Sequence, residues 1–245
     1  MLAAMNLPVP PWQTPKKRPA KQPLSREAIV AAALTVLDAE GLDALTMRRL
    51  AEELGTGPAS LYAHVKDKEE LYDLLIDAVC AEVRVPEASA EDWEERVKDF
   101  VRESVRVLTS HRDIGRIAMA RIPTGFNVLR VADGMLGVLK AGGLSDQDCA
   151  WAVDILSLYA NAHSYESSLF EQKLAWQENM LEVPFFEQLA EYYKALPADT
   201  FPNLAPMAAV MLTGNGDDRF EFGLDLLVRG LASRRPTVSP EVRPA

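Results

Sequence analysis

Cysteine and histidine are scarce in this 245-residue chain, which contains two cysteines and three histidines. Cys80 and Cys149 each fall inside a helical pattern, which predicts reduced thiols and a cytoplasmic protein rather than a disulfide framework. The longest purely apolar run lies near Ala28–Leu34 and is far too short to span a bilayer, so we expect no membrane partner. The first residues lack a basic start before the apolar ones, which argues against a secretory signal.

The sequence also lacks the patterns that mark strands, repeats and common enzymes. Alternating apolar and polar residues bounded by turn signals do not occur, which predicts an all-α fold. The Gly-x-Ser-x-Gly, Walker and His-Glu-x-x-His patterns are missing, and Gly214-Asn215-Gly216 has no preceding strand. We therefore predict no enzyme activity, no catalytic residues and no cofactor.

Basic residues are fewer than acidic ones, since the chain has 26 Lys and Arg and 36 Asp and Glu, for a net charge of −10. The distribution is uneven. Residues 1–68 carry nine basic and seven acidic side chains, and the remainder carries seventeen basic and twenty-nine acidic ones. An acidic body would repel the phosphates of DNA, so the protein would approach DNA with the short basic segment first. The alternative interpretation is that the acidic surface only favours solubility.

Apolar residues recur at helical spacing from residue 25 onward, and caps mark several helix ends. The first predicted helix begins at Ser25 and ends at Gly41, the second begins at Thr46, and the third covers about Pro58–Val65. The fourth runs from Asp67, which is paired with Glu70 as a capping box, to about Val83. Later helices are expected around Val97–Leu108, Leu129–Leu139, from Ser145 onward, Pro184–Leu196 with Phe185, Leu189, Tyr192 and Leu196 buried, and Asp217–Ser233. Residues 1–24, with six prolines and four basic side chains, predict a disordered arm, and residues 236–245 a disordered tail.

Two short helices joined by Gly55-Thr56-Gly57 have the form of a helix-turn-helix. The second helix presents the small residues Ala59, Ser60 and Ala63 opposite the apolar Leu61 and Val65. A recognition helix needs small residues there, because bulky side chains would hold its backbone away from the floor of the DNA groove. The pattern therefore predicts binding to double-stranded DNA.

The residues of this stretch resemble the TetR family of bacterial repressors. The matching signature is a threonine before the second helix, Leu54-Gly55 in the turn, and Leu61-Tyr62-x-His64-Val65-x-x-Lys68. A weaker similarity to the ligand-binding domain of tetracycline repressors lies in His111-Arg112-Asp113, Pro123-Thr124, and Phe220-x-Phe222-Gly223-Leu224-x-Leu226-x-x-x-Gly230-Leu231. The resemblance implies a three-helix DNA-binding domain at 25–68, a connecting helix at 69–85, and a larger helical domain at 86–235 for ligand binding and dimerisation.

The resemblance also implies roles for single residues. Arg48 and Ser60 match base-facing positions, and Pro58 and Ala59 match positions that touch apolar base edges. The positions that match contacts to the DNA backbone are Thr46, Tyr62, His64 and Lys68. Tyr62 could instead be a half-buried core aromatic, His64 an ordinary surface histidine, and Lys66 a solvated lysine.

Tetracycline-binding members hold magnesium with a histidine five residues before the Pro-Thr dipeptide, and this chain has Ala118 there. Alanine cannot ligate a metal, so we expect neither a metal site nor a tetracycline–magnesium effector. His163 and Glu166 are three residues apart, a spacing that can ligate metal, but a hydrogen-bonded histidine is the favoured interpretation because no third ligand is evident. The side chains expected to line a pocket for a small-molecule effector are Phe100, Ser104, Met119, Phe126, Met135, Tyr159, Asn161, His163, Glu166 and Trp176.

The sequence thus predicts a cytoplasmic, homodimeric repressor that a small-molecule effector releases from a palindromic operator. The predicted dimer helices are about Ser145–Gln172 and Asp217–Ser233, since the last helix carries a long apolar stripe. Two alternatives remain open, a helical adaptor that binds a protein partner and a TetR-like activator.

Overall fold

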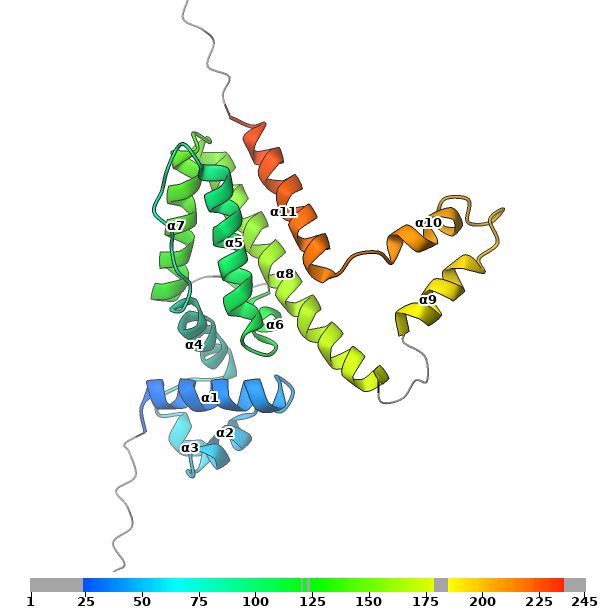
Figure 1. Cartoon of the computed structure of the whole chain (residues 1–245). Coiled ribbons are helices and arrows are strands. Elements are labelled where there is room, and N and C mark those ends of the chain that lie inside the picture. Colours follow the sequence, from blue (N-terminus) through cyan, green and yellow to red (C-terminus); the bar gives the residue numbers. More distant parts are fainter. Residues whose placement is uncertain (1–23, 120, 123, 179–184, 236–245) are drawn as a thin grey trace, which may run out of the picture.

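The structure is a computed structural model that describes residues 24–119, 121–122, 124–178 and 185–235. Within these residues every regular element is a helix, which confirms the predicted all-α fold. The predicted arm and tail fall on residues 1–23 and 236–245, which lie outside the described part. Three small helices form one end of the molecule, and a bundle of longer helices forms the body (Figure 1).

The N-terminal unit consists of α1 (Arg26–Glu40), α2 (Met47–Glu53) and α3 (Pro58–Leu61). The predicted helix starts are confirmed, because the Ser25 side chain accepts from the Ala28 amide and the Thr46 side chain accepts from the Arg49 amide. The helix α3 is shorter than expected. Its chain turns after Leu61, and the Val65 amide donates back to the Leu61 carbonyl across that turn. The buried residues of the three helices, Leu61 among them, and Val65 belong to the same hydrophobic core as those of the body.

The connecting helix α4 (Lys68–Cys80) begins at the predicted cap, where the Asp67 carboxylate accepts from the Glu70 amide. It ends before Val83, and a two-residue turn and a loop follow it. The last turn of the helix is fixed to residues 127–130 of the body. Asp77 accepts from the amides of Asn127 and Val128 at 2.7 and 3.1 Å, and Arg130 donates to the Cys80 carbonyl at 2.8 Å.

The body is built from α5 (Trp93–Thr109), α6 (Ile114–Ala118), α7 (Phe126–Ala141) and α8 (Asp146–Glu178). Ser145 caps α8 as predicted, because its hydroxyl accepts from the Asp148 amide at 3.1 Å. Trp93, Phe100 and Leu139 are among the largest fully buried side chains of the body. Gly115 allows α6 to lie directly on α8, since a Cβ there would be 2.9 Å from the Asn161 carbonyl oxygen.

The helices α9 (Phe185–Lys194) and α10 (Leu204–Met211) form a hairpin that stands off from the body (Figure 1). The prediction that the helix near Pro184–Leu196 buries its apolar side chains is wrong. No residue of α9 is buried, and Tyr192 is more than half exposed. The physical reason is that α9 packs mainly on α10, which is too small to cover it, and only its start approaches α8.

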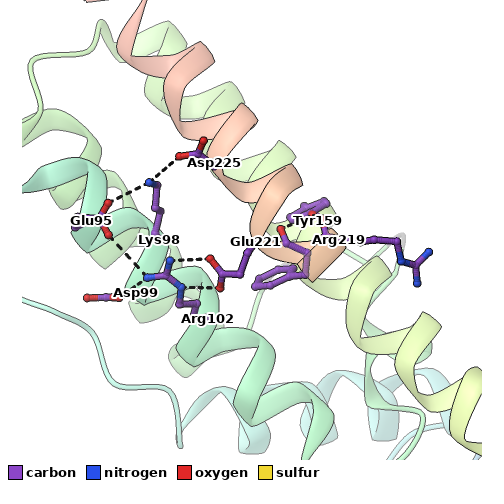
Figure 2. Close-up of polar contacts among 9 residues, drawn as sticks. Glu95, Lys98, Asp99, Arg102, Tyr159, Arg219, Glu221 and Asp225 are labelled. Atoms are coloured by element: carbon purple, nitrogen blue, oxygen red, sulfur yellow. Dashed lines mark hydrogen bonds and ion pairs between the residues drawn. The ribbon is translucent and has the colours of Figure 1, made fainter. Parts of the chain in front are cut away.

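The last helix, α11 (Gly216–Ala232), packs against α5 and α8. Phe220, Leu224 and Val228 are buried, as the apolar spacing predicted. Ion pairs fasten its other edge to α5 (Figure 2). Arg102 binds Glu221 through two nitrogens at 2.8 and 2.7 Å, and Lys98 lies 2.9 Å from Asp225.

A membrane-spanning helix would need a longer and more apolar stretch than any helix in the described ranges provides.

Candidate DNA-binding surface and ligand cavity

The corner between α2 and α3 is held in shape by one glycine and two apolar anchors. Gly55 adopts φ +58°, the left-handed region that a side chain disfavours, and the chain can therefore turn sharply after α2. Leu61 and Val65 are fully buried and fix α3 on the hydrophobic core. Gly57 precedes the helix, and Pro58 occupies its first turn. The consequence is that the opposite side of α3 faces outward.

Most of the residues predicted to contact DNA are exposed. Arg48 has 86% of its side chain exposed and is held only by Glu52 of its own helix at 3.1 Å. Tyr62 is 52% exposed, so it is not a core aromatic. The other predicted positions are exposed at Thr46, Pro58, Ala59 and Ser60, and half-buried at His64 and Lys68. Their side chains have the exposure that contact with DNA requires, and their individual roles remain predictions.

A pair of charged residues that the motif does not include holds the turn after α3. Arg26 donates from Nε to the His64 carbonyl at 2.8 Å and binds Glu70 at 2.6 Å. Glu70 in turn accepts from the Lys66 amide at 2.5 Å. The side chain of Lys68, in the first turn of α4, lies with its ammonium 5.2 Å from the centre of the Tyr72 ring. These contacts join α1, the turn and α4 into one unit.

A polar cluster connects the N-terminal unit to the body at residues 111–113. Asp113 is buried, adopts φ +58°, and accepts from the Leu42 amide at 2.9 Å and the Ser168 hydroxyl at 3.1 Å. Asp38 at the end of α1 accepts from the Arg112 amide at 3.0 Å and lies 3.1 Å from Nδ1 of His111. The segment before α6 is thereby tied both to the DNA-binding unit and to α8.

A cavity of about 450 Å³ lies among α4, α5, α7 and α8. Its wall is mostly aliphatic, and α4 contributes Ile76, Val79 and Cys80. Burial, with a smaller contribution from the nearby Asp77 charge, raises the pKa of the Cys80 thiol to about 11, so the thiol is protonated at neutral pH. The segment after α6 closes one side with Met119, Arg121 and Ile122. A volume of this size suits a small organic ligand.

Four of the ten residues predicted to bind a ligand line this cavity, namely Ser104, Met119, Met135 and Asn161. Five others lie elsewhere. Phe100 is buried in the core, Phe126 is 78% exposed, and Tyr159 donates to the Phe220 carbonyl at 2.8 Å. His163 stacks on the Phe220 ring with centroids 4.5 Å apart, and Glu166 lies 3.7 Å from Arg219. The side chain of Trp176 is outside the described part of the structure.

Sequence reasoning missed the contribution of α4 and of Arg121 to the cavity. The signal for α4 was present as apolar residues at Ile76, Val79 and Val83, which a buried helix would show in any case. Arg121 lies in a segment without helical pattern. It pairs with Glu69 and Asp73 of α4, and its guanidinium lies 5.2 Å from the centre of the Tyr72 ring. The ammonium of Lys68 lies against the same ring. Tyr72 therefore contacts both Arg121, which lines the cavity, and Lys68, which is predicted to contact DNA.

The residues present do not fit the magnesium site of tetracycline repressors. Ala118, at the position of the metal-binding histidine, has a methyl side chain and lines the cavity. Burial lowers the pKa of His163, against a smaller opposing effect of Glu166, and its ring is stacked rather than free. Among the described residues, no group of three or more His, Cys, Asp or Glu side chains is placed to hold a metal ion.

The exposed glycine-containing corner and the cavity in the helical body define a regulator of the helix-turn-helix class. The family can also be stated, because the model described as "Bacterial regulatory proteins, tetR family" matches residues 29–75 and the one described as "Tetracyclin repressor-like, C-terminal domain" matches residues 85–235. The chain therefore belongs to the TetR family of transcriptional regulators, with an N-terminal DNA-binding domain and a C-terminal ligand-binding domain.

Relatives cover nearly the whole chain. An HTH-type transcriptional regulator of Saccharopolyspora erythraea is 31% identical over 226 residues, which are 91% of each chain. The class C tetracycline repressor protein of Escherichia coli is 30% identical, over 88% of this chain and 94% of its own. The crystal structure of the TetR family protein ActR of Streptomyces coelicolor in complex with actinorhodin is 42% identical and has a TM-score of 0.79, over 89% of this chain and 99% of its own.

Proposed function

We propose that this chain is a cytoplasmic, homodimeric repressor that a small molecule bound in the cavity releases from a pseudo-palindromic operator. The effector is an uncharged or weakly polar compound with rings and needs no metal. A relative named as the transcriptional repressor DrrR1 is 29% identical over 238 residues, and the solved ActR structure contains actinorhodin. These two relatives favour repression and a ring-containing effector.

The observation that carries the proposal is the position of Arg121 between the cavity and the DNA-binding unit. Arg121 lines the cavity and is bound to Glu69 and Asp73 in the first turns of α4. Residues 62–67 separate those turns from the end of α3, and the turns include Lys68. A ligand that displaces the 112–124 segment therefore pulls on α4, and α4 carries the N-terminal unit.

The switch works by linkage. The ligand stabilises the conformation in which the two recognition helices of a dimer no longer match successive major grooves, and DNA stabilises the other conformation. A coupling free energy of about 1–3 kcal/mol would weaken operator binding by about 5–150-fold, which is enough to release the protein.

The proposed homodimer rests on apolar side chains that the isolated chain leaves in water. Trp151, Ile155 and Leu158 of α8 are about half exposed, as is Leu226 of α11, and Phe222 of α11 is 69% exposed. Side chains of this size at helical spacing are usually covered, and a second copy can pair the same two helices as a four-helix bundle.

Selection of bound fragments from random DNA tests the proposal first, because a palindrome with half-sites one or more helical turns apart, each about 34–36 Å, is expected. Compounds with rings are then screened by thermal shift in the presence of EDTA, and each hit is tested for release of the selected DNA. A hit that stabilises the protein only with magnesium contradicts the metal-free effector. Hits that stabilise the protein but leave DNA affinity unchanged contradict the switch.

A further inference from the structure

Three polar side chains of α8 line the cavity without a partner in the protein, and of these Asp154 and Ser157 are exposed while Asn161 is half-buried. Asp154, Ser157 and Asn161 all line it, and none of them makes a hydrogen bond or ion pair within the described part of the chain. Spacings of three and four residues place them along one side of the helix. Their hydrogen-bonding capacity is therefore available to a ligand.

Of the other polar groups of the wall, Ser104 and Arg121 already have partners, whereas the Thr124 hydroxyl makes no hydrogen bond within the described residues. The Ser104 hydroxyl donates to the Phe100 carbonyl of its own helix at 2.8 Å. Arg121, the one cationic side chain among the lining residues, is bound by both Glu69 and Asp73. A ligand thus meets two neutral amide or hydroxyl groups and one unpaired carboxylate on α8, and no unpaired positive charge.

The charge of the wall distinguishes between possible ligands. The lining contains two carboxylates, Asp73 and Asp154, and one cation, Arg121. Arg121 is paired with Asp73, so the charge of Asp154 is not balanced. An anionic ligand would leave water without a cationic partner and would be repelled by Asp154. A hydroxyl or ammonium group would instead donate to the Asp154 carboxylate.

Resting on the proposed function, we propose that the cavity selects effectors that carry a hydroxyl or amino donor at one edge of an apolar ring system. Asp154 and Asn161 bind that donor edge, and the aliphatic wall formed by α4, α5 and α7 binds the rings. Asp154 also excludes compounds that carry a carboxylate at the same edge. The two residues determine specificity, and Ile76, Val79 and Met135 supply apolar contact.

A matched series of fluorescent probes tests this selection. The probes are 9-anthracenemethanol, 9-methylanthracene and 9-anthracenecarboxylate, which share one ring system and differ in the edge group. Titration of the full chain is expected to give the tightest Kd for the alcohol, with the carboxylate weaker by about tenfold or more, as the loss of a hydrogen bond to a charged group predicts.

Variants separate the two residues. Asp154→Asn removes the negative charge and is expected to reduce the preference for the alcohol over the carboxylate by about fivefold or more. Asn161→Leu is expected to weaken the alcohol about fivefold and leave 9-methylanthracene unchanged. Asp133→Asn, which makes the same charge change on an exposed site of α7 that does not line the cavity, is the control and should alter neither ratio.

Equal Kd values for the alcohol and the carboxylate would overturn the proposal, as would a ratio unaffected by Asp154→Asn or the absence of measurable binding of the alcohol. Release of selected DNA is measured separately. The predicted order of Kd values without release of DNA supports this selection and contradicts the switch. If the probes release DNA but the order of their Kd values is the same in the wild type and in Asp154→Asn, the switch is supported and this selection is overturned.

Discussion

Lys68 and Lys66 are two residues apart, but only Lys68 is held in place at the start of α4. The ammonium of Lys68 lies 5.2 Å from the centre of the Tyr72 ring, whereas Lys66 is 86% exposed and lies 3.9 Å from Asp67. We expect Lys68→Ala to weaken binding to all DNA sequences alike and to make the salt dependence shallower by about one unit, because one phosphate contact is lost. Mobility shifts at several salt concentrations measure the slope.

The matched control for this prediction is Lys66→Ala, which should leave the slope of salt dependence unchanged. Arg48→Ala should instead relax the preferred sequence, at a cost of about 1–3 kcal/mol if the side chain reads guanine. A changed sequence preference in Lys68→Ala with its salt slope intact would contradict the assigned roles.

Gly223 and Gly230 belong to the same helix but have different surroundings. A Cβ at Gly223 would be 2.2 Å from the Tyr159 hydroxyl, which donates to the Phe220 carbonyl, whereas nothing lies within 4 Å of a Cβ at Gly230. We expect Gly223→Ala to lower the free energy of unfolding by about 1–3 kcal/mol through overpacking. Gly230→Ala should raise it by up to about 1 kcal/mol, because alanine favours the helix.

Urea unfolding of both glycine variants measures these changes. Equal stability of the two variants would show that α8 and α11 are not packed as closely as the Tyr159 contact requires.

The contact between α5 and α11 depends on carboxylates whose pKa values are lowered. The hydrogen bond from Arg102 holds the pKa of Glu221 below its ordinary value, against a smaller opposing effect of burial. A carboxylate with a lowered pKa in the folded state contributes stability above its ordinary pKa, and that contribution is lost as the pH falls through the lowered value. We therefore expect Glu221→Gln to destabilise the protein at neutral pH by at most about 1 kcal/mol, since the pair is partly exposed.

The difference in unfolding free energy between the wild type and Glu221→Gln should shrink as the pH falls below the ordinary value of 4.5. Chemical unfolding between neutral and acid pH measures it. The control is Glu187→Gln on the exposed hairpin helix α9, for which no such difference is expected. A difference for Glu221→Gln that stays constant down to acid pH would contradict the assigned role of the Arg102 pair.

Helix starts were predictable at several side-chain caps, although the Asn215 capping box that begins α11 was missed. Ser25, Thr46 and Asp67 each accept from an amide three residues ahead, so local sequence determines where α1, α2 and α4 begin. The helix α10 was not predicted, because it is short and Asn203 makes no capping bond that would mark its start. The burial expected for α9 failed since apolar spacing indicates a face but not whether anything covers it.

The exposure of the predicted DNA-contact residues could be predicted from local sequence, and the lining of the cavity could not. All predicted DNA contacts fall within residues 46–68, where spacing along two short helices fixes which side chains share a face. The cavity instead combines α4, α5, α7, α8 and the 118–125 segment. Asp154 and Arg121 carry no local signal of their position there, because the packing of distant helices brings them together.

At the scale of the whole molecule, the exposed apolar side chains of α8 and α11 predict the assembly. We expect the double variant Ile155→Glu, Leu226→Lys to have a monomer mass by light scattering at micromolar concentration, where the wild type has a dimer mass. Desolvation of charges in the interface is the physical cause. The variant should also bind palindromic DNA more weakly, because two half-sites are no longer bound together.

Leu129→Glu makes a comparable change at a half-exposed site on α7 and should leave the dimer intact. A monomeric wild type, or a dimer unaffected by the double variant, would contradict an interface built from these two helices.

The helix α8 contributes to two surfaces at once, and this ties the response of the protein to its abundance. Asp154 and Asn161 face the cavity, Trp151 and Ile155 face outward, and Leu158 belongs to both sets. In the proposed homodimer a shift of this helix changes effector affinity and subunit affinity together, and the two are linked reciprocally. The dose of effector that gives half-maximal release therefore depends on how much of the protein a cell holds. A dose–response curve recorded at one expression level does not apply at another.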